Sequence, residues 1–140
     1  MLSKKLEKRE RSLFELIEKR VFFIRGRKVM LSTHLADLCG IEPRVLIQAF
    51  KRNKARFPEG LFIFQLNARE FSALKSQIVI SKYNRIRRSL PYAFTEQGVV
   101  ALSGVLRSKS AIAMSAIIIR NFVKPHRPYL KARSIAPEVW

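Results

Sequence analysis

"HLADLCGIEPRVLIQAFKRN", residues 34–53, is the stretch from which the fold class follows. It predicts two helices, around 33–39 and 43–54, joined by a tight turn. Ala36 is small enough to let two crossing helices touch, and Gly40 supplies the left-handed residue that such a turn needs. The order of small residue, glycine and basic helix is therefore typical of a helix–turn–helix pair.

The second predicted helix divides into two faces. Three apolar residues fall at helical spacing and are predicted to pack on the first helix: Leu46, Ala49 and Phe50. Four residues form the opposite, base-reading face: Arg44, Ile47, Gln48 and Lys51. In the major groove, Arg44 and Lys51 would reach guanine O6 and N7, and Gln48 would read adenine N6 and N7. Phosphate contacts are predicted for three basic residues nearby: Arg52, Lys54 and Arg56.

The charge balance favours a polyanionic partner. The chain has 140 residues, with 28 Lys and Arg against 10 Asp and Glu, for a net charge of +18. Its 48% hydrophobic content supports a folded core rather than a disordered basic peptide. Because the basic residues are spread through a folded pattern, double-stranded DNA is favoured over an anionic membrane surface.

The rest of the chain predicts an α+β fold, a small single domain with a helix–turn–helix-like pair and short antiparallel β-hairpins. Residues 21–31 read as a hairpin that turns at Gly26. Further strands are predicted at 61–66, 77–80 and 90–94, and further helices at 68–75, 96–106 and 109–123. The expected division is a charged N-terminal helix (1–20), a DNA-binding domain (21–124) and a flexible basic tail (125–140).

Several polar residues are expected to cap helices. Ser32 or Thr33 can cap the helix at 33–39, and Thr95 and Ser108 can cap the last two helices. A capping box is expected at the start of the helix at 68–75, formed by Asn67 and Glu70.

A polar, strongly basic loop, "SKYNRIRRS", separates the two strands predicted at 77–80 and 90–94. Four of its residues are predicted to hold DNA phosphates as a basic wing: Lys82, Arg85, Arg87 and Arg88. An Arg88→Ala change is expected to weaken binding to all sequences alike.

Three segments in order, "IRGRKVMLSTHLADLCGIEPRVLIQAFKRNKARFPEGLFIFQL", "SQIVIS" and "LPYAFTEQGVVALSGVLRS", closely resemble the phage ORF-six-N domain. This domain belongs to the KilA-N group of DNA-binding modules in phage and bacterial regulators and antirepressors. The resemblance covers about residues 22–124 and implies an α+β DNA-binding domain without catalytic residues. The basic loop departs from the Trp-Gly-Gly-type turn that the family often carries there.

The residues give no pattern for catalysis or cofactor binding. His34 and Cys39 are too few for a structural zinc site, and the carboxylates form no close cluster in sequence. No cofactor, metal or enzymatic activity is therefore expected. One cysteine, no signal peptide and no apolar run of about 20 residues predict a cytoplasmic, nucleoid-associated protein.

Other functions remain open at the level of sequence. The helix pair is also compatible with an ordinary αα-hairpin that has a solvated basic face. A module that binds a protein partner, antirepressor-like or homodimerising, would use the N-terminal helix and an exposed apolar patch on the last helix. RNA binding would require a surface cluster of aromatic residues, and a nuclease would require a spatial cluster of carboxylates.

Overall fold

The computed structural model describes residues 2–78 and 90–122, with side chains from residue 8 onward except that of residue 10. The chain opens with α1 (Leu2–Lys19), β1 (Val21–Ile24), β2 (Arg27–Leu31), α2 (Ser32–Cys39), α3 (Pro43–Arg52) and the 3-10 turn η1 (Lys54–Arg56). It continues with β3 (Ile63–Gln65), α4 (Ala68–Leu74), the 3-10 turn η2 (Lys75–Gln77), β4 (Tyr92–Thr95), α5 (Glu96–Ser103) and α6 (Lys109–Phe122). The predicted α+β class is confirmed.

The strands of the described chain form one antiparallel sheet in the order β1-β2-β4-β3. The predicted hairpin is confirmed: β1 and β2 are joined by Arg25 and Gly26, both with positive φ (57° and 74°). Positive φ at both turn residues matches the twist of the flanking strands. Strand β4 lies between β2 and β3, so residues far apart in the sequence share its backbone hydrogen bonds.

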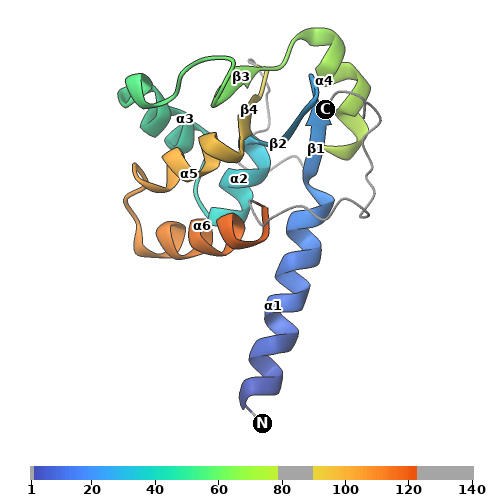
Figure 1. Cartoon of the computed structure of the whole chain (residues 1–140), viewed down its shortest axis with the longest axis vertical. Helices are drawn as coiled ribbons and strands as arrows, with labels where there is room; N and C mark the ends of the chain where they lie inside the picture. Colours follow the sequence, from blue (N-terminus) through green and yellow to red (C-terminus); the bar gives the residue numbers. More distant parts are fainter. Residues whose placement is uncertain (1, 79–89, 123–140) are drawn as a thin grey trace.

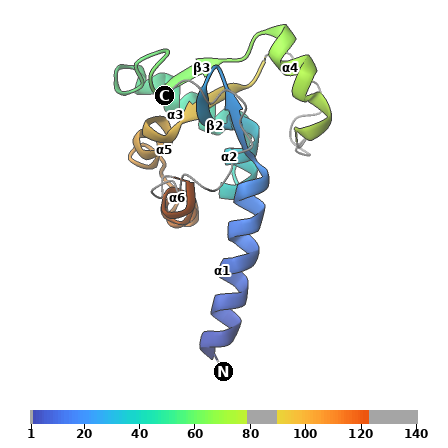
Figure 2. The same ribbon diagram turned by 45° about the vertical axis from the view of Figure 1, so that its right-hand side comes forward.

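Helices cover the two faces of the sheet unequally (Figures 1 and 2). Helices α2, α3, α5 and α6 gather on one side, α4 lies on the other, and α1 projects away from the body. The larger core cluster lies with the four helices and takes Met30, Ile63 and Phe94 from the sheet. A second cluster on the opposite face includes Val29 and Phe64, and Phe71 and Leu74 of α4 pack against it.

The junction between β4 and α5 packs closely against the backbone of Phe62. The Thr95 backbone N–H donates to the Phe62 carbonyl oxygen at 3.0 Å, and the Thr95 side chain accepts from the Gly98 N–H. A Cβ atom placed on Gly98 would overlap the Phe62 carbonyl. Thr95 therefore caps α5 as predicted, and the absence of a side chain at Gly98 allows α5 to pack closely against Phe62.

Two other predicted caps are confirmed and one is wrong. Asn67 and Glu70 form the reciprocal capping box of α4, and the Ser108 hydroxyl accepts from the Ala111 N–H. Ser32 and Thr33 do not cap α2, because both already lie inside it. Strand β2 passes directly into α2, and the Ser32 hydroxyl accepts instead from the Tyr92 N–H at 3.0 Å.

Some element bounds differ from those predicted. The helix expected at 43–54 ends at Arg52, because the chain tightens into η1 two residues later. The helix expected at 96–106 ends at Ser103. The strand expected at 61–66 shortens to β3, because the Phe62 N–H bonds to the Pro58 carbonyl in a turn.

The strand predicted at 77–80 is wrong over its described part. Gln77 ends η2, and Ile78 is buried in the second core cluster without pairing to a strand. Residues 79 and 80 lie outside the described residues. Ile78 therefore anchors the end of η2 to the core, where a strand was expected to extend the sheet.

Two ionisable side chains are buried in α2. His34 is fully buried and stacks on Phe22 with ring centroids 5.9 Å apart. Burial, assisted by the charge of Arg20, lowers the pKa of His34 to about 4. Burial also raises the pKa of the Cys39 thiol to about 11. Both groups are therefore uncharged at neutral pH and serve the core.

Gly98→Ala should lower the free energy of unfolding by about 3 kcal/mol, because the added methyl overlaps backbone that cannot move without breaking the β4–α5 junction. Gly104→Ala is the matched control, since its new Cβ would meet only ordinary contacts. Urea denaturation of both variants tests the expectation. Equal midpoints for the two would contradict it.

The stability should depend on pH through His34. The pKa of His34 is 6.5 in the unfolded chain and about 4 in the folded chain, so the folded chain takes up this proton only at lower pH. The free energy of unfolding should therefore fall as pH drops below 6.5, by about 1–2 kcal/mol at pH 5. Urea titrations at pH 7 and pH 5 measure this. His34→Gln should remove most of the pH dependence, and an unchanged dependence in this variant would refute the assignment.

Candidate nucleic-acid interface

The turn between α2 and α3 has the geometry that the sequence predicted. Gly40 adopts the left-handed conformation with φ of 70°. The Ile41 N–H donates to the Ala36 carbonyl at 3.0 Å, which closes the end of α2. Ala36 is fully buried, and Pro43 occupies the first turn of α3. Three residues therefore join two packed helices, as in a helix–turn–helix pair.

The inward face of α3 is the predicted one: Leu46, Ala49 and Phe50 are buried. The exposed face is formed by five residues: Arg44, Val45, Gln48, Lys51 and Arg52. With 100° between successive helical residues, Gln48 lies at the centre of this arc. Ile47, predicted to share the face, is half-buried against the core and lies at its margin.

Val45 is the residue of this face that sequence reasoning missed. Its side chain is 42% exposed and lies three residues before Gln48. The apolar pattern alone cannot tell which flank of a helix turns outward, because the crossing of α3 over α2 decides it. In this fold the crossing covers Ile47 and exposes Val45.

The exposed cations of α3 and η1 have few carboxylates near them in the sequence. Five cations and no carboxylate lie between Pro43 and Pro58. Arg44 pairs with Glu42 at 3.0 Å, but its side chain is 74% exposed, and such surface pairs contribute little to stability. The three residues predicted to hold phosphates, Arg52, Lys54 and Arg56, are all exposed. The Arg56 guanidinium lies beside Gly104, at the end of α5.

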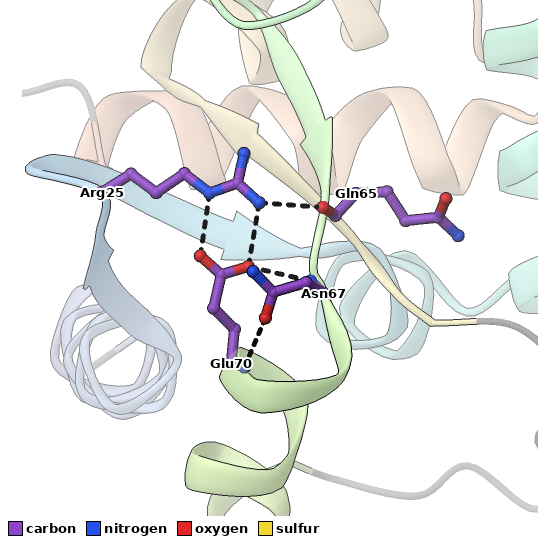
Figure 3. Close-up of polar contacts among 4 residues, drawn as sticks. All are labelled: Arg25, Gln65, Asn67 and Glu70. Carbon is purple, nitrogen blue, oxygen red and sulfur yellow. Dashed lines mark hydrogen bonds and ion pairs between the residues drawn. The ribbon is translucent and has the colours of Figure 1, made fainter.

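The arginines of the β1–β2 hairpin have a different use. Arg25 donates to both carboxylate oxygens of Glu70, at 2.8 and 2.9 Å, and to the Gln65 carbonyl (Figure 3). Its guanidinium also lies 4.2 Å from the centroid of the Phe64 ring. The same carboxylate accepts from the Asn67 N–H, and the Arg25 hydrogen bonds lower the pKa of Glu70. This cluster ties the hairpin to the start of α4.

Two neighbouring cations are also engaged within the fold. Arg27 donates to the carbonyls of Gly60 and Leu61, at 3.2 and 2.8 Å, and Lys28 pairs with Glu96 at 3.2 Å. The basic hairpin therefore stabilises the fold. Unlike the cations on α3 and η1, its charge is largely neutralised or bound to carbonyls.

Three segments with exposed cations lie on one side of the molecule. Helix α3, η1 and the link between α5 and α6 share the side away from α4 in both views (Figures 1 and 2). Arg107 in that link and Lys109 at the start of α6 are exposed, and neither was predicted as a site residue. The four predicted basic-wing residues, Lys82, Arg85, Arg87 and Arg88, lie outside the described residues.

Within residues 2–78 and 90–122, no three His, Cys, Asp or Glu side chains come together as a metal-binding group. No helix in the same ranges is both long and apolar enough to cross a membrane.

Comparison with known proteins gives one match. Residues 19–105 match the ORF6N domain, so the match covers more than half of the chain and every element from β1 to α5. Helix α6 follows the matched segment but contributes Ile118 and Phe122 to the same core. No curated protein and no solved structure matches the chain. The chain therefore belongs to the ORF6N domain family.

Proposed function

We propose that this chain is the DNA-binding module of a phage- or prophage-type transcriptional regulator. The observation that carries the proposal is the exposed face of α3, with Gln48 at its centre and cations on both sides. The face belongs to the second helix of a helix–turn–helix pair, which is the helix that enters the major groove in such proteins. Membership of the ORF6N family supports the same function.

In this proposal the base contacts come from α3. Gln48 reads adenine through N6 and N7, while Arg44 and Lys51, one turn before and after it, take guanine O6 and N7. Arg44 gives up its exposed pair with Glu42 at little cost.

The phosphate contacts hold this helix in register. Arg52, Lys54 and Arg56 grip one stretch of backbone, and Arg107 and Lys109 extend the basic surface across the link between α5 and α6. The loop residues Lys82, Arg85, Arg87 and Arg88 are proposed to add a basic wing. Phosphate contacts supply affinity and salt dependence, whereas the α3 contacts supply sequence preference.

A protein-binding role has less support. It would be favoured by an apolar patch on α6, but that helix turns Ala111, Ile118 and Phe122 into the core and leaves Ile112 exposed. RNA binding would be favoured by a surface cluster of exposed aromatic rings. Among the described residues the most exposed aromatic side chain is Phe23, at only 38%, so the described surface gives RNA binding little support. We therefore place double-stranded DNA first, with the protein acting in the cytoplasm on the nucleoid and without catalysis.

Gln48→Ala should relax sequence preference at one base pair, because it removes the bidentate contact to adenine. The expected loss is about 10-fold in affinity for the preferred duplex, with little change for a random duplex. Competition binding against both duplexes measures the ratio. Gln77→Ala, an exposed glutamine in η2, is the matched control and should leave the ratio unchanged. Equal losses of Gln48→Ala on both duplexes would contradict the assignment.

Arg52→Ala should weaken binding to all duplexes alike, because a phosphate contact carries no sequence information. The slope of log affinity against log salt concentration should flatten by about 1. Fluorescence anisotropy across a salt series measures the slope. Arg69→Ala on α4 removes an equal charge from the other side of the molecule and should change the slope less. The same slope for both variants would remove α3 from the interface.

A further inference from the structure

We propose that Val45 determines specificity by contacting the 5-methyl group of a thymine, in the base pair that Gln48 reads or in the adjoining one. The inference rests on the proposed function and extends it to an apolar contact. Val45 lies in the first turn of α3 and is 42% exposed. The N-terminal residues of a recognition helix are the ones that meet base edges.

Val45 has no evident role in the stability of the fold. The stripe that packs α3 on the core is complete with Leu46, Ala49 and Phe50, and Val45 is not among the residues packed against the core cluster. A β-branched residue also has a lower helix propensity than the lysine, arginine or glutamine side chains around it. Val45 is therefore an exposed apolar residue at one edge of this polar face, available for a contact outside the fold.

The chemistry of the major groove limits what that contact is. Among the four bases, thymine alone displays an apolar group there, its 5-methyl. Val45 and Gln48 are three residues apart, so their Cβ atoms lie about 5–6 Å apart on one face of the helix. Successive base pairs rise by about 3.4 Å, so the two side chains reach the same or neighbouring pairs. An adenine read by Gln48 places thymine within that reach.

The test begins with the duplex that the wild-type protein enriches from a random pool. Each thymine is then replaced in turn by deoxyuridine, which lacks only the 5-methyl group. At one position the wild-type protein should lose about three- to fivefold in affinity, the effect of one buried methyl. Val45→Ala should lose a similar factor on the thymine duplex and show no further loss on the deoxyuridine duplex.

Val100→Ala is the matched control, because Val100 is a similarly exposed valine on α5, at 46%. It should keep the full discrimination between thymine and deoxyuridine. The proposal is overturned if no thymine is sensitive, or if Val45→Ala still discriminates as the wild-type protein does. Both results leave sequence-specific binding intact, whereas a failure to enrich any sequence would also overturn the proposed function.

Discussion

The pairing of β2 with β4 positions the proposed recognition helix. Strand β2 ends at Leu31 and α2 begins at the next residue, so no loop separates the sheet from the first helix of the pair. Strand β4 passes in the same way into α5. The pairing of Leu31 with Ala93 fixes where α2 and α5 begin relative to each other. The three-residue turn at Gly40 then fixes the orientation of α3 relative to α2. The direction in which Gln48 points follows from strand pairing.

Two groups of cations in the described part of the chain have different uses. In the hairpin, Arg25 binds the Glu70 carboxylate of α4 and Arg27 binds the backbone carbonyls of Gly60 and Leu61, so both arginines tie the hairpin to segments that follow later in the chain. On α3 and η1 the cations are exposed and no carboxylate lies between Pro43 and Pro58. For the proposed function this difference matters, because cations bound to carboxylates or carbonyls within the fold are not available to bind DNA phosphates.

Local rules predicted much of this fold. Turn glycines, the Asn67–Glu70 capping box and the buried face of α3 are encoded by residues close in sequence, so periodicity and capping chemistry were enough to find them. The predictions that were wrong depend on contacts between residues far apart in the sequence. The Ser32 hydroxyl serves Tyr92 across the sheet, and Ile47 is half covered by the core. The exposure of Arg44, Gln48 and Lys51 was predictable from the sequence. The partial burial of Ile47 and the exposure of Val45 were not, because the angle at which α3 crosses α2 decides which flank is covered.

The central claim is that α3 reads DNA sequence while the surrounding cations bind its backbone. The most direct measurement is a salt titration of binding to a random duplex pool, followed by sequencing of the bound fraction at moderate salt. We predict a steep salt dependence together with an enriched motif. A steep dependence without enrichment would reduce the protein to a backbone binder, and no binding at low salt would contradict the DNA-binding function altogether.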